Sequence, residues 1–253
     1  MKNLRITMAV LGFLAAVILS TSAQGSAAGN RYAKEGVEAS KAKNWDKAVD
    51  NFRKAVEAEP KDKSNEQNLG IALIQRATEF LKKKNYDGAI TDLNEAIKLR
   101  PTANAHRSRA YAYLGKGDNK NALEDYNEVV KELKGDPEPL ERRAYVEMQL
   151  QQTDKALADY NELIKLRPKE AKYYNLRAYA LQLKENFKGS LADTMKVLQL
   201  EPGNAEAKQR KAFLEKRLNF TTPTPTPSGP IANPNARPMP TQSNNPYTAP
   251  TPK

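Results

Sequence analysis

The chain has 253 residues, of which 39% are hydrophobic and 28% are charged, which is enough apolar material for one large core or a repeat array. It contains no cysteine, which excludes disulfides, thiolate nucleophiles, cysteine metal sites and a lipoprotein anchor. The formal net charge of +11 favours acidic partners, such as anionic polymers, lipid head groups or acidic proteins, without naming one.

The first 28 residues have the layout of a secretory signal peptide. Lys2 and Arg5 precede the apolar segment 6–19, and small residues follow it, with cleavage expected after Ala23 or after Ala28. The alternative is an uncleaved anchor, but an apolar segment of this length is short of the ~20 residues that span a bilayer. We therefore expect an exported protein, periplasmic or extracellular, with no stable membrane span after cleavage.

Small residues recur in two registered series through residues 29–220. The first series has intervals of 41, 33, 34 and 34 residues and consists of Ala48, Ala89, Ala122, Ala156 and Ser190. The second series lies twelve residues earlier in each unit and consists of Gly36, Ala77, Ala110, Ala144 and Ala178. A helix stop follows each unit, at Pro60, Pro101, residues 135–137, Pro168 and Pro202. The period indicates about five repeats.

Each unit carries apolar stripes with the spacing of amphipathic helices. Ala156, Tyr160 and Leu163 form one such stripe. A single helix hairpin cannot bury its stripe alone, so neighbouring hairpins must stack. Small residues at the crossings let helix axes approach to ~8–10 Å. The sequence therefore predicts an all-α solenoid of about five helix-turn-helix repeats.

The repeat pattern resembles the tetratricopeptide repeat family. Its units have about 34 residues, with small residues where the helices touch and proline at the exit. The family's large residue four positions after the second-helix alanine is matched by Phe52, Tyr126 and Tyr160, becomes Leu93 in the second unit and is lost as Thr194 in the fifth. The resemblance covers about three quarters of the chain. It implies a curved array whose concave side, lined by the first helices, binds protein or peptide segments.

The interval of 41 residues is the main departure from this period. Ser64 and Gln67 have the spacing of a capping box, which predicts that the first helix of the second unit begins there and ends near Leu81. That helix would be about two turns longer than its counterparts. We interpret the added length as an extension that projects from one edge of the solenoid. At the other end, residues 205–220 are predicted to form a final capping helix.

Residues 221–253 contain ten of the sixteen prolines and are expected to form an extended, disordered tail. The tail is either a spacer or a recognition segment, which could carry O-linked sugars because threonine alternates with proline. The expected organisation is thus a signal peptide over 1–28, a helical solenoid over 29–220 and this tail.

Candidate binding residues lie in the expected first helices. The motif Arg-Ala-Tyr recurs around Ala110, Ala144 and Ala178, and the resemblance directs its tyrosines toward the groove. The candidate groove residues are Tyr111, Tyr145, Tyr179, Arg107, Glu141 and Asn175. The alternative is that the tyrosines are packing residues. The positions that match the family's carboxylate clamp for chaperone tails hold Ala33, Val37, Ile74 and Thr78, so a chaperone-tail receptor is not expected.

Nothing in the sequence indicates catalysis. It has no glycine-rich phosphate loop, no metal-ligand set and a single histidine, His106. The acidic residues of the segments 125–128 and 159–162 recur at the repeat period, and we interpret them as a solvated helix face. We expect no enzyme, no cofactor and no metal.

The leading hypothesis is an exported scaffold that binds a protein or peptide segment through the groove. The alternative is a cell-envelope or matrix component that binds an anionic polysaccharide or wall polymer. It is suggested by the tail and by a charge of +7 for residues 29–220, outside which lie Lys2, Arg5, Arg237 and Lys253. Nucleic acid is an unlikely partner because export removes the usual substrate.

Overall fold

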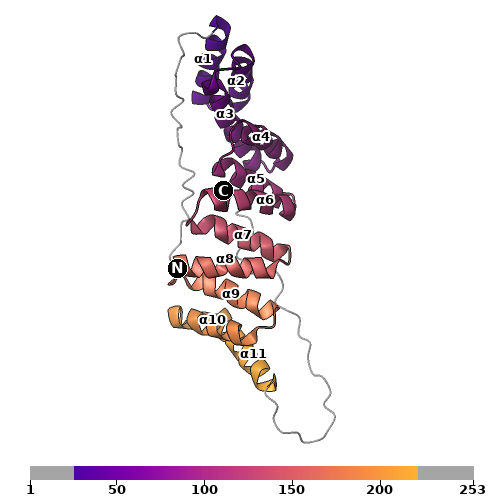
Figure 1. Ribbon diagram of the computed structural model, residues 1–253, viewed down its shortest axis with the longest axis vertical. Coiled ribbons are helices and arrows are strands. Elements are labelled where there is room, and N and C mark those ends of the chain that lie inside the picture. Colours follow the sequence, from indigo (N-terminus) through magenta and orange to yellow (C-terminus); the bar gives the residue numbers. More distant parts are fainter. Residues whose placement is uncertain (1–25, 222–253) are drawn as a thin grey trace, which may run out of the picture. The chain divides into compact units, whose positions relative to one another are not determined.

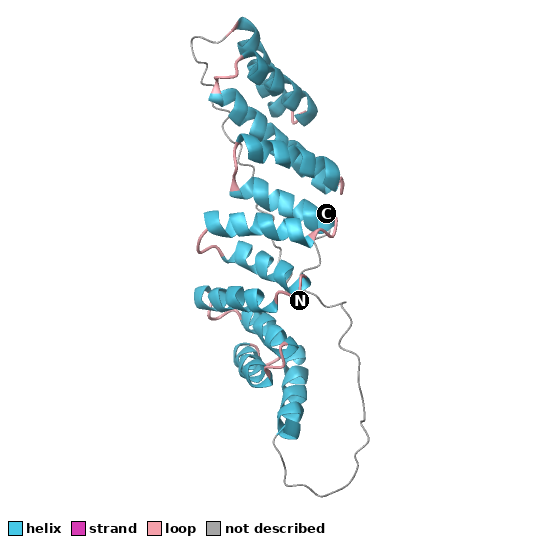
Figure 2. Cartoon of the chain, turned by 45° about the vertical axis from the view of Figure 1, so that its right-hand side comes forward, coloured by secondary structure: helices cyan, strands magenta, loops and turns pink. Residues whose placement is uncertain are grey.

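The computed structural model describes residues 26–221, and every regular element among them is a helix (Figures 1 and 2). Nearly all of the expected leader, and the expected tail beyond Thr221, lie outside the described residues. The chain divides into two compact units, Met1–Ala112 and Tyr113–Lys253, which are described separately below. No helix of the described part is long and apolar enough to cross a membrane.

The first unit consists of helix hairpins stacked along the chain. Its helices are α1 (Ala27–Lys41), α2 (Trp45–Ala58), α3 (Lys63–Lys82), α4 (Tyr86–Leu99) and most of α5 (Ala103–Gly115). Consecutive helices pack against each other from α1 to α4.

The second unit repeats this arrangement. Its helices are α6 (Asn119–Glu132), α7 (Pro137–Gln149), α8 (Thr153–Leu166), α9 (Ala171–Leu183), α10 (Phe187–Leu200) and α11 (Ala205–Thr221). Consecutive helices pack against each other from α6 to α11. The predicted all-α architecture of stacked hairpins is therefore confirmed within each unit.

The turn inside each hairpin has a recurring local structure. One residue adopts a left-handed backbone, as Lys43 (φ 55°), Lys84 (φ 57°) and Glu185 (φ 58°) do, and the next residue is the N-cap of the second helix. At four of these turns an asparagine or aspartate caps that helix and accepts the backbone N–H three residues later; these caps are Asn44, Asn85, Asp118 and Asn186. Such caps satisfy amide groups that the helix itself leaves unpaired.

The two registered series of small residues lie inside the units. All the alanines of both series, and Ser190, have 0% exposure. Gly36 is buried, and a Cβ added there would lie 2.7 Å from the ring of Phe52, so only glycine fits this crossing. The large residues Phe52, Leu93, Tyr126 and Tyr160 are buried beside them. Close helix approach at small residues thus builds the core.

Helix α3 differs from the sequence prediction in two respects. Its cap is Asp62, whose carboxylate accepts the backbone N–H of Ser64 at 2.9 Å, so the predicted capping box at Ser64 is wrong. Its first turns do not project: Asn65 is 2% exposed and its amide donates to the carbonyl of Ala55 in α2 at 3.5 Å. The added length is confirmed, since α3 has 20 residues and α5 has 13. The extra turns enlarge the contact with α2.

Candidate binding face

The predicted groove residues of the second unit lie on its first helices, α7 and α9, and α11 continues the series. Lys172 of α9 forms an ion pair with Glu141 of α7. Asn175 of α9 accepts a hydrogen bond from Arg210 of α11 and donates one to Glu206 at 3.4 Å. Side chains of α7, α9 and α11 thus meet in one polar strip. We call the side of these three helices that carries the strip the first-helix face.

The strip is held by partly buried groups. The side chain of Arg210 is 8% exposed, and its guanidinium also donates to Glu206 at 2.5 Å. Burial lowers the pKa of Arg210, which Glu206 partly offsets. For Tyr173 the shift has the opposite sign: burial and the negative charge of Glu141 raise its pKa to about 12. These contacts fix the side chains before any ligand arrives.

The predicted tyrosines are not equivalent. Tyr179 is 43% exposed and lies close enough to Arg210 to affect the pKa of the guanidinium. Tyr145 is half-buried and packs against the core cluster that contains Leu140 and Tyr160. Tyr179 therefore offers an aromatic face to a ligand, whereas Tyr145 is also a packing residue.

Two predicted groove residues belong to the first unit. Arg107 and Tyr111 lie in α5, where both are half-buried on either side of the fully buried Ala110. The candidate binding face consists of residues of the second unit alone.

The arginines of the Arg-Ala-Tyr motif form buried salt bridges. Arg143 donates to both carboxylate oxygens of Asp159, at 2.8 and 2.6 Å, and Arg177 does the same to Asp193, at 2.7 Å for both. In the first unit Arg76 pairs with Asp92 at 2.8 Å. Hydrogen bonding to the aspartate raises the pKa of each of these arginines.

These pairs correct one sequence interpretation. Asp125 and Asp159 are 2% and 5% exposed, so they are not part of a solvated face, although Glu128 and Glu162 are exposed as expected. A carboxylate can be buried here because the guanidinium of the first helix neutralises it and fills its acceptor sites. The sequence does contain a signal for these salt bridges, because the arginine and the aspartate of each pair are 16 residues apart.

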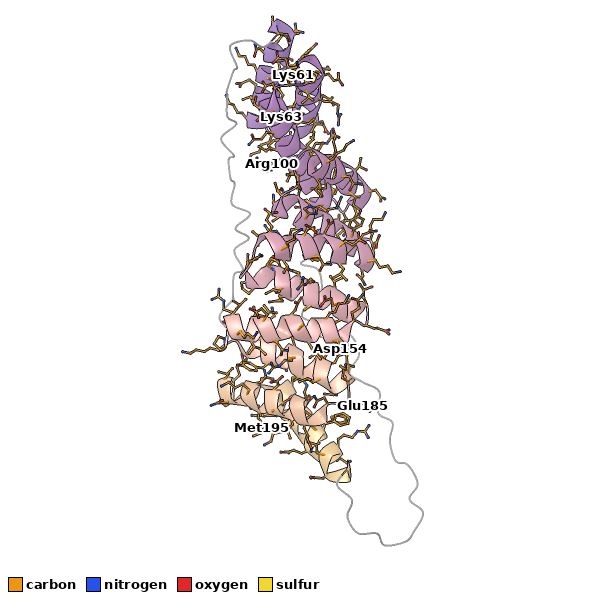
Figure 3. All side chains as sticks on the ribbon, viewed as in Figure 1. Lys61, Lys63, Arg100, Asp154, Glu185 and Met195 are labelled. Carbon is orange, nitrogen blue, oxygen red and sulfur yellow. The ribbon has the colours of Figure 1, made fainter. Side chains whose placement is uncertain are left out.

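Each arginine also contacts the preceding repeat. Arg143 donates to Asn127 of α6 at 3.3 Å, and Arg177 donates to Asn161 of α8 at 2.7 Å. In α10 the corresponding position is Met195, which is 54% exposed (Figure 3). Each arginine thus contacts both the second helix of its own repeat and the second helix of the preceding repeat. The series of asparagines ends at Met195 of α10, so α11 lacks the equivalent contact.

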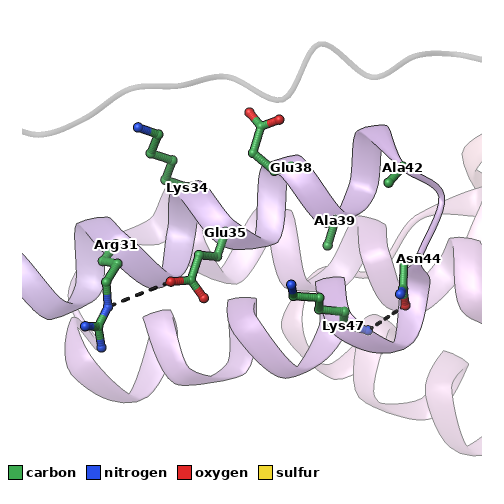
Figure 4. Close-up of a pocket in the computed structure, with 8 residues that line it drawn as sticks. All are labelled: Arg31, Lys34, Glu35, Glu38, Ala39, Ala42, Asn44 and Lys47. Carbon is green, nitrogen blue, oxygen red and sulfur yellow. Dashed lines mark hydrogen bonds and ion pairs between the residues drawn. The ribbon is translucent and has the colours of Figure 1, made fainter.

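The described residues contain no group of three or more histidine, aspartate or glutamate side chains placed to hold a metal ion. One hollow of about 530 Å³ lies between α1 and the start of α2 (Figure 4). Its charged lining is Arg31, Lys34, Lys47, Glu35 and Glu38. Arg31 and Glu35 pair at 3.9 Å, and the mixed signs give the hollow no strong preference for an anion or a cation.

Comparison with known proteins agrees with the fold. Similar solved structures include YrrB, described as a tetratricopeptide repeat protein with an unusual peptide-binding site (16% identity, TM-score 0.53, covering 72% of this chain and 90% of that chain). Another is MamA from AMB-1 (18% identity, TM-score 0.51, covering 70% and 93%). No curated protein matches the chain significantly. A family model for the tetratricopeptide repeat matches residues 74–137 and 142–205, about half of the sequence, and the chain belongs to that family.

Proposed function

We propose that this protein is an exported interaction scaffold that binds a protein or peptide segment through the first-helix face of its second unit. Tetratricopeptide repeats are in general non-enzymatic scaffolds for protein or peptide partners, and the fold neighbour YrrB has a peptide-binding site. The observation that carries the proposal is Tyr179, a large aromatic side chain that is 43% exposed beside the polar strip.

The geometry supports peptide binding in two ways. Exposed tyrosine supplies contact area at low entropic cost, which makes it a frequent binding anchor. Asn175, Lys172 and Glu141 are already held by neighbouring side chains, so a ligand would not have to order them. A ligand would meet fixed polar groups next to an open aromatic ring.

Export is the second part of the proposal and depends on the leader. Ser26 caps α1, because its hydroxyl accepts the backbone N–H of Gly29 at 3.0 Å. Cleavage after Ala23 would retain this cap, whereas cleavage after Ala28 would remove it together with the first residues of α1. We therefore favour cleavage after Ala23. N-terminal sequencing of the secreted protein tests this, and a mature chain that begins at Gly29 would contradict it.

The binding proposal is tested with the full chain and a random twelve-residue peptide library displayed on phage. We expect enrichment of specific sequences, and Tyr179→Ala should weaken their binding by about tenfold or more. Tyr174→Ala is the matched control on the same helix, since Tyr174 is 9% exposed and its hydroxyl donates to the carbonyl of Pro168 at 3.1 Å. The control should lower stability and leave the affinity per folded molecule unchanged. Absence of enrichment, or affinity that survives Tyr179→Ala, would refute the proposal.

The alternative, binding of an anionic envelope polymer, is favoured by the charge of +7 of residues 29–220. Dextran sulfate is a suitable probe. Binding driven by charge should collapse between low and moderate ionic strength, because salt screens exposed charges. Peptide binding to an aromatic face should persist in the same buffers.

A further inference from the structure

The end of the first-helix face holds a group of exposed large apolar side chains. Four large apolar side chains are at least 42% exposed, and three of them lie here: Tyr179 and Leu183 on α9, and Phe213 on α11. Phe213 follows Tyr179 by 34 residues, so α11 repeats the position of the tyrosine. Soluble proteins rarely leave such a group uncovered unless it binds something.

Contacts between α9 and α11 bring these residues together. Asn175 lies one turn before Tyr179, and Arg210 lies one turn before Phe213. The side chains of Asn175 and Arg210 are hydrogen-bonded, and Tyr179 lies close enough to Arg210 to affect the pKa of the guanidinium. The three exposed apolar side chains are therefore neighbours on one surface.

A cation adjoins this surface. The guanidinium of Arg217 lies 5.9 Å from the centre of the Phe213 ring and 5.8 Å from that of Phe187, the first residue of α10. Arg217 is exposed and has no carboxylate partner in the part of the chain that the structure describes. Arg210, two turns earlier in α11, is by contrast occupied by Glu206 and Asn175.

We propose that this end of the face is a subsite for a partner segment in which bulky apolar side chains adjoin an aspartate or glutamate. Tyr179, Leu183 and Phe213 would cover the apolar side chains, and Arg217 would pair with the carboxylate. Stacking on the rings leaves the edge of the guanidinium, with its N–H groups, open to a bidentate carboxylate. A single guanidinium suits a side-chain carboxylate better than a chain terminus, which usually needs several donors. The inference rests on the proposed function and adds the partner's chemistry.

The test uses the full chain and a labelled peptide, blocked at both ends, that contains two Phe-Asp pairs. Arg217→Gln should weaken its binding by about tenfold, the usual loss of a charge-assisted hydrogen bond. The same variant should not change the affinity of a peptide with Phe-Asn pairs. Phe213→Ala should weaken both peptides about tenfold. Because both residues are exposed, unchanged melting curves should show that the variants fold.

Arg167→Gln is the matched control, since Arg167 is another exposed arginine of the same unit, in the loop before α9. An equal loss in this control and in Arg217→Gln would overturn the subsite, because it would reflect net charge alone. Self-association in sedimentation that Phe213→Ala abolishes would also overturn it, by assigning the surface to a second copy. If library peptides bind through Tyr179 but ignore Phe213 and Arg217, this inference fails and the proposed function stands. If no peptide binds, both fail.

Discussion

The fourth and fifth repeats, α7–α8 and α9–α10, have the same helix arrangement but differ at two positions that flank the turn inside each hairpin. Both have the arginine–aspartate pair and the bond from the arginine to the preceding helix. The fifth repeat has Leu181 and the helix cap Asn186 where the fourth has Glu147 and Gln152. The residues Glu147 and Gln152 are adjacent, because the backbone N–H of Gln152 donates to the carbonyl of Glu147 at 2.8 Å.

In the fourth repeat, Glu147 and Gln152 each have a buried side-chain oxygen without a hydrogen-bond donor among the described residues. Glu147 is 4% exposed, and neither its Oε2 nor the Oε1 of Gln152 has a hydrogen-bond partner among the described residues. The pKa of Glu147 is raised to about 7, mainly by burial and also by the negative charge of Asp159, while Arg143 and Lys155 limit the rise. The comparison shows that the scaffold tolerates a titrating carboxyl group inside a repeat, at a cost that depends on pH.

The largest expected effect is the loss of an arginine from either pair. Arg177→Ala leaves Asp193 buried and unpaired, which should lower the free energy of unfolding by about 3–5 kcal/mol. Arg143→Ala should lower the free energy of unfolding still more at pH 8, because the positive charge of Arg143 also stabilises the ionised carboxylate of Glu147. Urea unfolding of both variants measures the difference.

The double variant Arg177→Leu with Asp193→Leu is the control for this prediction. It removes both charges, so it should recover most of the loss. A loss below about 1 kcal/mol in Arg177→Ala, the range of surface pairs, would show that the salt bridge contributes little.

Glu147→Leu copies the fifth repeat into the fourth and should change how stability depends on pH. The folded pKa of about 7 lies above the ordinary value of 4.5 for glutamate, so the neutral acid is favoured in the folded state. Its contribution is complete below about pH 4.5, is lost as the pH rises to about 7 and is constant above that. Glu147→Leu should therefore be more stable than the natural chain by about 3 kcal/mol at pH 8, with the gain shrinking toward pH 4.5.

Urea midpoints of the two proteins between pH 4 and 9 check this, and only the difference between the curves is informative, because other carboxyl groups also titrate. Leu181→Glu is the reciprocal variant and should introduce a similar pH dependence into the fifth repeat. A difference curve that is flat with pH would rule out a raised pKa for Glu147.

The sequence predicted the repeat architecture because its causes are local and periodic. Proline stops, small residues at the crossings and apolar stripes recur in register, and each alone constrains a helix. Partners across helices are harder to predict: periodicity places the aspartates at 125 and 159 on the surface, because it does not distinguish a charged face from a buried pair. The contacts of Asn175 with α11 are not predictable either, since the pattern of residues 205–220 indicates only a capping helix.

The orphaned oxygens of the fourth repeat illustrate the same limit. Glu147 is unusual among the aligned repeats, because the residues at the same position in the other repeats are apolar or aromatic: Ala39, Phe80, Tyr113 and Leu181. Only the structure shows that Glu147 is 4% exposed and that its Oε2 lacks a donor. The aligned repeats therefore identify position 147 as unusual, and its burial shows that the carboxyl group there is costly to ionise.

The smallest expected effect is the restoration of the missing cap. Gln152 precedes α8 with φ −85° and ψ 52°, nearly the backbone of Asn186 at φ −79° and ψ 69°, but its side chain makes no cap hydrogen bond. Asn186 accepts the backbone N–H of Gly189 at 3.0 Å, so the shorter amide at 152 should reach the N–H of Lys155 in the same way. Gln152→Asn should thus stabilise the chain by about 0.5–1 kcal/mol. Urea midpoints at one pH measure this gain, and Asn186→Gln should show an opposite change of similar size. If Asn186→Gln costs nothing, the side-chain cap does not stabilise this repeat, and the gain expected from Gln152→Asn is refuted with it.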